Sequence, residues 1–165
     1  AGARVAPTSS APKRDACRAL GAELALDRRD PAWPARLRDA WDGVDVILDM
    51  VGADTSAAAF ELLDTGGRLV WIAALSGSRL EIDVRTLMRG RLTLKGSTLR
   101  SRPLTEKITL RDAFLARFGG DLELGRIVPV IHEVLGIEEA DRAHGLLRAD
   151  ATIGKVVLRV GEGYG

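Results

Sequence analysis

One stretch of the sequence, Gly43 to Leu75, constrains the fold of this chain more than any other. It reads GVDVILDMVGADTSAAAFELLDTGGRLVWIAAL. Residues 44–50 form a nearly continuous apolar run, which is typical of a strand that is covered on both faces. A second run of this kind follows at 68–74, after a segment with helical spacing. Strand, helix and strand within about thirty residues predict a right-handed crossover between parallel strands.

The helix of this crossover is predicted from three apolar residues at one-face spacing, Ala59, Leu62 and Leu63. Asp54 is placed to cap the helix, because a carboxylate accepts the free N–H groups of a first helical turn. Gly66–Gly67 is expected to end the helix before the second strand begins.

Ligands of parallel sheets bind beyond the carboxyl ends of the strands. In this sequence those ends are Val51-Gly52-Ala53 and Ala74-Leu75-Ser76-Gly77. Small residues there allow a flat ring to lie against the backbone. The alternative interpretation is a pair of tight turns after buried strands, where glycine is expected in any case.

The composition argues against several classes of site. Cys17 is the only cysteine, which excludes an internal disulfide and a cysteine-based zinc site. The two histidines, His132 and His144, lie far apart and lack zinc-helix spacing. Basic and acidic residues are interleaved at a net charge of +1, so no nucleic-acid partner is expected. No apolar run approaches the roughly 20 residues of a membrane span, and no signal peptide is recognised, so a cytoplasmic protein is expected.

The remaining elements are weaker predictions. Helices are expected at 12–20 with Gly21 as a C-cap, at 31–41, at 103–118 with Gly119–Gly120 as a stop, and at 138–148. Strands are expected at 3–6, 23–26, 92–97, 127–134 and 155–160. Residues 161–165 are glycine-rich and are expected to form a loose tail.

No pair of nucleophile and base stands out, so no catalytic residue is predicted. Asp49, inside a buried strand, is interpreted as a hydrogen-bonding structural group. His144 is expected to pack within its helix, and Cys17 to be a small buried hydrophobe.

Six short segments follow one another in a distinctive order: VDVILDMVG, GGRLVWIAALSG, LTLKGSTLRSR, GRIVPVIHEV, EEADRAH and IGKVVLRV. In this order and spacing they resemble the quinone oxidoreductase branch of the medium-chain dehydrogenase/reductase family. The resemblance covers nearly the whole chain, Gly2 to Val160. It is strongest to the zinc-free, NADPH-dependent quinone reductases, including the p53-inducible type.

The resemblance implies an α/β fold, an incomplete Rossmann-like parallel sheet with flanking helices. Residues 1–160 would form a partial dinucleotide-binding domain that opens at the second Rossmann strand. The first strand and the glycine-rich turn that grips the pyrophosphate are not found in the sequence. Residues 150–160 would contain the strand that returns to a catalytic domain, and the sole tyrosine, Tyr164, lies in the tail. A fragment or truncated form is therefore expected.

At the adenosine end, the usual acidic partner of NAD is not found after the second strand, which reads Pro7-Thr8-Ser9-Ser10. Ser10, Lys13 and Arg28 are the candidate cofactor residues there, because cations suit the extra phosphate of NADP. The alternative is a helix-capping hydroxyl at Ser10 and solvated charges at Lys13 and Arg28. NADP is favoured over NAD.

At the nicotinamide end, the resemblance implies contacts from two groups of residues. The first follows the two central strands and consists of Val51, Gly52, Ala74, Leu75 and Ser76. The second lies in the segment GSTLRSR and consists of Thr98, Leu99 and Arg100. The alternative for the second group is an ordinary basic loop, with Arg102 solvated. The preceding edge strand, Leu92–Ser97, would pair with its twin in a homodimer.

The function implied is hydride transfer from NADPH to a quinone or enone, without metal, by an enzyme of which this chain supplies the cofactor-binding part. That part is expected to be inactive alone. Two alternatives remain open. One is a non-catalytic remnant or a subunit that complements a partner. The other is an S-adenosylmethionine-dependent methyltransferase, which also carries an acidic-apolar strand, a helix and GGRLV.

Overall fold

The computed structural model describes residues 2–161, and residues 162–165 of the predicted tail at 161–165 lie outside them. The chain forms two compact units, residues 1–107 and 108–165. In chain order the first unit contains β1 (Thr8–Ser9), η1 (Ala11–Lys13), α1 (Arg14–Ala19), β2 (Leu26–Asp27), α2 (Trp33–Trp41), β3 (Val44–Asp49), α3 (Ala53–Leu62), β4 (Leu63–Trp71), α4 (Val84–Gly90) and β5 (Thr93–Gly96). The helix α5 (Leu104–Glu123) crosses the boundary, and β6 (Ile131–Gly136), η2 (Ile137–Glu139), α6 (Ala140–Arg148) and β7 (Lys155–Arg159) follow it.

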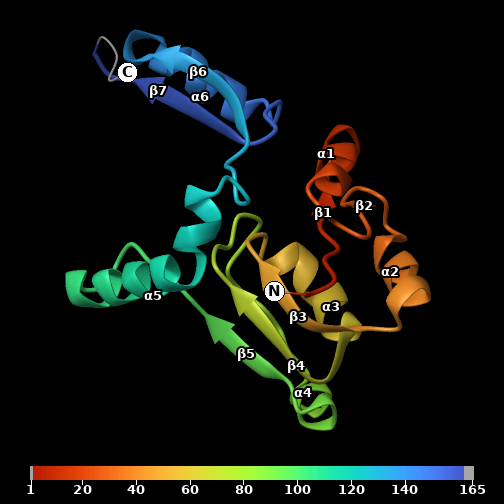
Figure 1. The fold of residues 1–165 in the computed structure, drawn as a ribbon. Coiled ribbons are helices and arrows are strands. Elements are labelled where there is room, and N and C mark those ends of the chain that lie inside the picture. The colour runs from red at the N-terminus through yellow and green to blue at the C-terminus, as the bar shows by residue number, and fades with distance from the viewer. Residues whose placement is uncertain (1, 162–165) are drawn as a thin grey trace. The chain divides into compact units, whose positions relative to one another are not determined.

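The centre of the first unit is a parallel sheet in the order β3-β4-β5 (Figure 1). In its register Asp49 lies opposite Trp71, and Trp71 opposite Gly96. The carboxyl ends of the three strands therefore lie at one edge of the sheet. The crossover predicted from residues 43–75 is confirmed, and so is the α/β fold with parallel strands and flanking helices.

The predicted ends of α3 are wrong. The helix begins at Ala53 with Gly52 as its N-cap residue, so Asp54 lies inside the first turn and does not cap it. The backbone N–H of Asp54 donates to Ser76 Oγ at 3.1 Å instead. At the other end α3 stops at Leu62, and Gly66 lies within β4. The chain changes from helix to strand between Leu62 and Leu63 without a glycine, and both side chains are buried, each in its own apolar cluster.

Two apolar clusters hold this unit together. The first joins Leu26, Leu37 and Leu62 and is surrounded by half-buried residues that include Trp33 and Trp41. The helix predicted at 31–41 thus packs through one apolar side. The second cluster joins Ala59, Leu63 and Leu69 beneath α3. Since apolar burial is the main stabilising term in folding, these clusters fix α2 and α3 against the strands.

The strands β1 and β2 form a separate parallel pair, and among the described strands β3 pairs with β4 alone. The outer face of β3 carries exposed apolar side chains: Val46, Leu48 and Met50 are 48%, 62% and 50% exposed. Residues 44–50 were expected to be covered on both faces, and in this structure only one face is covered. We call these three side chains the β3 outer face.

Other boundaries differ from the predictions in ways that have local causes. Gly119–Gly120 does not stop α5, which continues to Glu123. A helix tolerates internal glycine at a cost of about 1 kcal/mol each, and the helix ends where Gly125 adopts φ +65°. At the start of the chain the first strand is β1 and not 3–6, although Val5 C=O still accepts the N–H of Glu23.

The second unit contains a further parallel pair, β6 with β7, joined through α6. Leu135 of β6 and Ala143 of α6 are its buried apolar residues. The extended segment predicted at 127–134 is displaced, since β6 spans 131–136. The predicted helix at 138–148 and the strand at 155–160 are found within two residues of their expected bounds.

Arg4 and Glu23 form an ion pair beside Trp41 of α2, and this ion pair leads to a prediction about pH. Arg4 donates to both carboxylate oxygens of Glu23, at 2.8 and 2.6 Å, and its guanidinium lies 4.4 Å from the ring of Trp41. The hydrogen bond from Arg4 lowers the pKa of Glu23 below its ordinary value of 4.5. A lowered folded-state pKa gives stability that is present above the unfolded value and is lost as the pH falls through the folded value.

We therefore expect Glu23→Gln to lower the midpoint of thermal unfolding at about pH 7 and to have a smaller effect as the pH falls through the lowered folded-state pKa of Glu23, where the carboxylate takes up a proton. Glutamine keeps the shape and one acceptor for the Trp41 indole N–H, so the difference reports the charge. Glu61→Gln, at an exposed carboxylate of α3, is the control. A Glu23→Gln effect that is constant over this pH range contradicts the prediction.

Candidate functional site

The predicted residues of the nicotinamide end are brought together by the sheet. Val51 and Gly52 follow β3, Ala74 to Ser76 follow β4, and Thr98 to Arg100 follow β5. The hydrogen bonds of the sheet continue beyond the strands, since the N–H of Ile72 donates to Asp49 C=O at 2.8 Å. This edge of the β3-β4-β5 sheet is the candidate site.

The turn after β3 is organised by the side chain of Asp49, which is 5% exposed. Its Oδ1 accepts the backbone N–H groups of Val51 at 2.6 Å and Gly52 at 3.3 Å. Its Oδ2 accepts the hydroxyl of Thr55 at 2.8 Å. The hydroxyl of Ser56 donates to Gly52 C=O at 2.7 Å. The interpretation of Asp49 as a hydrogen-bonding structural group is therefore confirmed.

This turn is joined directly to the turn after β4. Gly52 and Gly77 form a parallel bridge, and the N–H of Ala53 donates to Gly77 C=O at 3.1 Å. Both the N–H and the hydroxyl of Ser76 donate to Val51 C=O, at 2.8 and 3.0 Å. The two turns thus form one hydrogen-bonded rim, which we call the paired turns (residues 49–56 and 74–77). Sequence reasoning assigned no role here to Thr55 or Ser56.

The paired turns are poorly suited to a phosphate. The amide groups at the start of α3 already have acceptors: Ala53 donates to Gly77, Asp54 to Ser76 and Thr55 to Gly52. Anion sites at helix N-termini depend on such groups being free. The carboxylates of Asp49 and Asp54 also oppose a negative ligand. This rim is therefore suited to the uncharged part of a ligand.

The segment after β5 is fastened by Arg102, which is not simply solvated. Its Nε donates to Thr98 C=O at 2.8 Å and its Nη1 to Glu106 at 3.0 Å, and a longer contact of 3.4 Å reaches the hydroxyl of Ser97. Lys107 Nζ donates to Arg100 C=O at 3.1 Å. These contacts hold the segment that carries the side chains of Thr98, Leu99 and Arg100, all three of which are exposed.

The predicted residues of the adenosine end lie at the carboxyl ends of β1 and β2. Ser10 is 7% exposed and precedes η1, but its side chain makes no capping hydrogen bond. The helix-capping alternative for Ser10 is therefore wrong. Lys13 is half-buried, and Arg28 is exposed directly after β2, where its N–H donates to Ser9 C=O at 2.9 Å.

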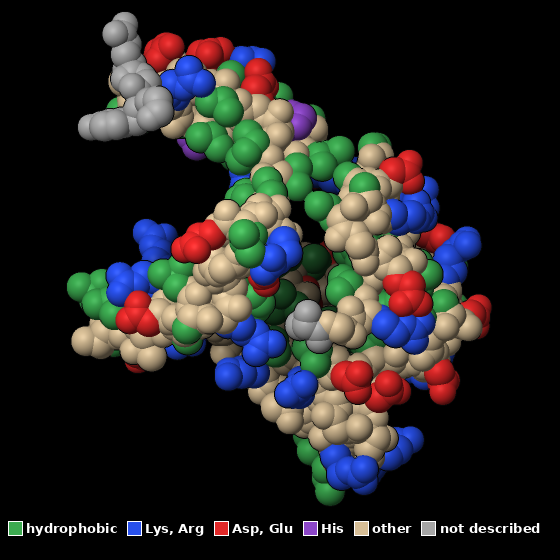
Figure 2. Space-filling model, in the orientation of Figure 1, with side chains coloured by type: hydrophobic (Ala, Val, Ile, Leu, Met, Phe, Trp, Pro, Cys, Tyr) green, Lys and Arg blue, Asp and Glu red, His purple; other side chains and the backbone are tan. Residues whose placement is uncertain are grey.

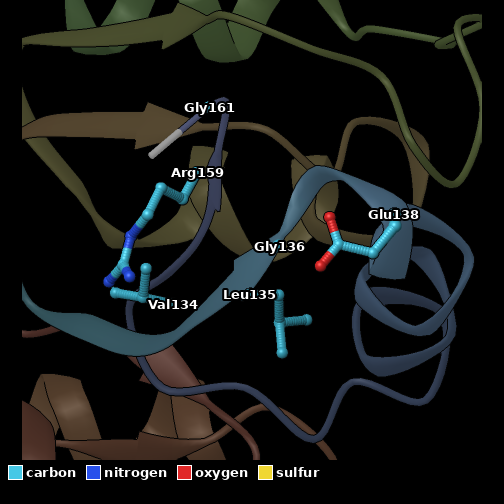
Figure 3. A pocket seen from close by; sticks show the side chains of 6 residues that line it. All are labelled: Val134, Leu135, Gly136, Glu138, Arg159 and Gly161. Atoms are coloured by element: carbon cyan, nitrogen blue, oxygen red, sulfur yellow. The ribbon is translucent and has the colours of Figure 1, made fainter. Parts of the chain in front are cut away.

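The histidines and the pocket add no catalytic group. His144 is exposed on α6, so the expectation that it packs is wrong. A depression at the ends of β6 and β7 is lined by Val134, Leu135, Gly136, Glu138, Arg159 and Gly161 (Figure 3). It contains none of the predicted site residues, and in Figure 3 the side chains of Glu138 and Arg159 lie on different sides of it. We assign no function to it.

The surface agrees with the charge pattern of the sequence. Figure 2 shows basic and acidic side chains scattered among one another on the face in view, without a continuous basic stripe. Within residues 2–161, no helix has the length and apolar character needed to cross a membrane.

Known proteins resemble this chain over most of its length. Residues 20–158 match the protein family described as zinc-binding dehydrogenase. A probable quinone oxidoreductase of Schizosaccharomyces pombe is 26% identical over 158 residues, which is 96% of this chain and 47% of that protein. The chain thus spans about half the length of this relative.

Solved structures resemble the fold as well. An NAD-dependent alcohol dehydrogenase is 31% identical with a TM-score of 0.79, covering 97% of this chain and 45% of that one. A mycobacterial quinone oxidoreductase is 30% identical with a TM-score of 0.75, covering 96% of this chain and 50% of that one. Both likenesses extend over the β3-β4-β5 sheet and its paired turns, because they cover nearly the whole chain.

The family description names zinc, but the residues described here offer no matching set of donors. No group of three or more His, Cys, Asp or Glu side chains is gathered among them in a way that could hold a metal ion. We therefore derive no step through zinc. The match over residues 20–158 shows that this chain belongs to the zinc-binding dehydrogenase family.

Proposed function

We propose that this chain is the cofactor-binding portion of an NADPH-dependent oxidoreductase that reduces a quinone or an enone. The observation that carries the proposal is that the carboxyl ends of β3, β4 and β5 meet at one edge of the sheet. The paired turns and the Thr98–Arg100 segment lie at this edge, and the amides at the start of α3 are already hydrogen-bonded there. Such an edge is where parallel sheets bind nucleotides. The family match and the quinone oxidoreductase relatives support the class of reaction.

The preference for NADP over NAD is proposed from the ends of β1 and β2. Lys13 and Arg28 follow the ends of β1 and β2, where the backbone N–H of Lys13 donates to Ser10 C=O and that of Arg28 to Ser9 C=O, both at 2.9 Å. Arginine and lysine both suit a phosphate, arginine by two parallel hydrogen bonds and lysine as a point charge. Asp27, the last residue of β2, accepts the N–H of Arg29 at 2.9 Å and so is partly engaged within its own turn.

When bound, the nicotinamide supplies the hydride and the protein supplies its orientation. In this proposal Val51, Gly52, Ala74, Leu75 and Ser76 lie against the nicotinamide and its ribose, mainly through the backbone. The exposed side chains of Thr98, Leu99 and Arg100 line the side where a quinone or enone approaches. We assign no catalytic side chain, and we propose that the chain by itself does not turn over substrate.

A second candidate function rests on the open edges of the sheets. The strands β1 and β3 have no pairing with one another, and the β3 outer face is apolar and exposed. Unpaired edges and apolar faces favour association with another strand. A subunit that is completed by a partner polypeptide would use these edges, and co-purification of this chain with such a polypeptide would favour this candidate over an active enzyme.

We also propose a homodimer through β5. This strand pairs with β4 on one side only, and Thr93 and Lys95 on it are exposed. Pairing of two β5 strands would cover the free edge and extend the sheet. Sedimentation of the purified chain would show a monomer if this proposal is wrong.

The function is tested by calorimetric titration of the chain with NADPH and NADH. We expect weak binding of NADPH and weaker binding of NADH, because no free helix N-terminus is available at the paired turns to hold the pyrophosphate. Lys13→Ala together with Arg28→Ala is expected to remove the preference for NADPH. Arg91→Ala, at an exposed cation after α4, is the matched control.

Two results of this titration would contradict the proposal. Binding of NADPH with a Kd below about 1 μM would contradict the account of the missing phosphate site. Binding of S-adenosylmethionine without binding of either nicotinamide cofactor would favour the methyltransferase alternative.

A further inference from the structure

We infer that Asp49 is a positioning residue for the cofactor, because it sets the conformation of the turn against which the nicotinamide lies. The inference rests on the proposed function and adds to it a residue that touches neither cofactor nor substrate. Three observations carry it: the burial of the carboxylate, its set of donors, and the connection of that set to the second turn.

The burial of Asp49 comes without a basic partner. The side chain is 5% exposed, and no lysine or arginine forms an ion pair with it in the described structure. A buried carboxylate is costly unless hydrogen bonds replace its water. Here two backbone amides and one hydroxyl do so, from Val51, Gly52 and Thr55. Burial of the carboxylate therefore depends on the donors of the turn, and the conformation of the turn depends on the carboxylate.

The set of donors fixes an otherwise unfavourable backbone. Gly52 has φ +95° and ψ −120°, a conformation that side-chain-bearing residues rarely adopt. The Asp49 carboxylate accepts the N–H of this residue, while the Ser56 hydroxyl and the Thr55 backbone N–H donate to its carbonyl. The N–H and C=O groups of Gly52 are thus both hydrogen-bonded, and these bonds hold the two peptide groups that flank Gly52.

The turn after β3 is hydrogen-bonded to the turn after β4, so its conformation also affects that second turn. Val51 C=O accepts two bonds from Ser76, and Ala53 donates to Gly77. Release of the carboxylate contacts would free the Val51 and Gly52 amides and so loosen both turns. Because the proposed contacts to the nicotinamide are mainly main-chain, loss of this order would weaken cofactor binding although Asp49 itself makes no contact with the cofactor.

The test uses the full chain labelled with ¹⁵N. Amide hydrogen exchange is measured at Val51 and Gly52, and NADPH is then titrated while the signals of the paired turns are followed. For Asp49→Ala we expect exchange at these two amides to be about tenfold faster or more, and NADPH to bind about tenfold more weakly. Asp49→Asn keeps an acceptor oxygen for the amides and is expected to restore most of both properties.

Two further variants keep the test decisive. Thr55→Val removes a single donor and is expected to give a smaller change in the same direction, which can be measured even if Asp49→Ala does not fold. Asp45→Ala removes an exposed carboxylate from the same strand and is expected to match the wild type.

The outcomes separate this inference from the proposed function. Unchanged exchange at Val51 and Gly52 in Asp49→Ala overturns the inference. So does faster exchange with unchanged NADPH affinity, since Asp49 would then be only structural. A wild-type chain whose paired turns do not respond to NADPH rejects the proposed function, while the exchange rates still show whether Asp49 holds the turn.

Discussion

Replacing Leu69 by alanine is expected to lower the free energy of unfolding of the first unit by about 2–5 kcal/mol. Leu69 is 0% exposed and lies in β4, in the apolar cluster with Ala59 and Leu63. Truncation removes buried carbon atoms and leaves a cavity that the helix above cannot fill, because Ala59 has no side chain long enough to reach into it. Chemical denaturation followed by circular dichroism measures the change.

The matched control is Leu48→Ala on the β3 outer face. Leu48 is 62% exposed, so its truncation is expected to cost less than about 1 kcal/mol. Similar costs for the two variants would show that the β3 outer face is covered in solution, by a second copy of the chain or by another polypeptide. The comparison thus tests the complementation candidate at the same time.

The core and the candidate site are physically coupled through β4. Leu69 anchors the strand from below, and two residues later Trp71 accepts the N–H of Ser97 at its carbonyl. Trp71 packs edge-to-face on Phe60 of α3, with ring centroids 6.5 Å apart. The strand end that carries the turn at 74–77 is therefore held by side chains that take no part in binding, and a loosened core is expected to reduce cofactor affinity indirectly.

The central part of the fold was predictable because two patterns agreed there. The apolar runs at 44–50 and 68–74 are too short for helices and are separated by a helix-length segment, and the structure confirms their parallel pairing. Glycine was the less reliable signal. Gly66–Gly67 and Gly119–Gly120 were expected to end helices, but one pair lies in a strand and the other in a helix. A glycine permits a break in regular structure, but packing decides whether the break occurs.

The position of the candidate site was predictable from the sequence, but the hydrogen bonds that hold it were not. Glycine and small residues after two buried strands placed the turns at 51–53 and 74–77 correctly at one sheet edge. Asp49 was predicted to be a hydrogen-bonding structural group, but its donors were not predictable, and neither was the role of Arg102, because a buried or solvated side chain gives no periodic signal in a sequence. Asp49 accepts from backbone N–H groups two and three residues away and from the Thr55 hydroxyl, and Arg102 donates to a backbone carbonyl four residues away. Only the turn geometry reveals those contacts.

The second prediction with a large effect concerns Gly52, which has a positive φ and lies within the paired turns of the candidate site. A Cβ built at this residue would lie 2.5 Å from Gly77 C=O and 3.1 Å from Ala74 Cα, both backbone atoms. Gly52→Ala is therefore expected to separate the paired turns. The cost of the positive φ alone is about 1–3 kcal/mol, and the contact with Gly77 adds to it because a backbone must move.

Gly66→Ala is the control that separates these two causes. Gly66 has φ +82°, but a Cβ there would have no heavy atom within 4 Å, so this variant carries the backbone strain without the collision. We expect Gly52→Ala to be the less stable of the two by denaturation and, alone of the pair, to expose the amides of Ala53 and Ser76 to faster hydrogen exchange. Equal stabilities would mean that the turns after β3 and β4 do not stay paired in solution. The paired turns would then not be a preformed site, and any affinity for a nicotinamide cofactor would include the cost of bringing them together.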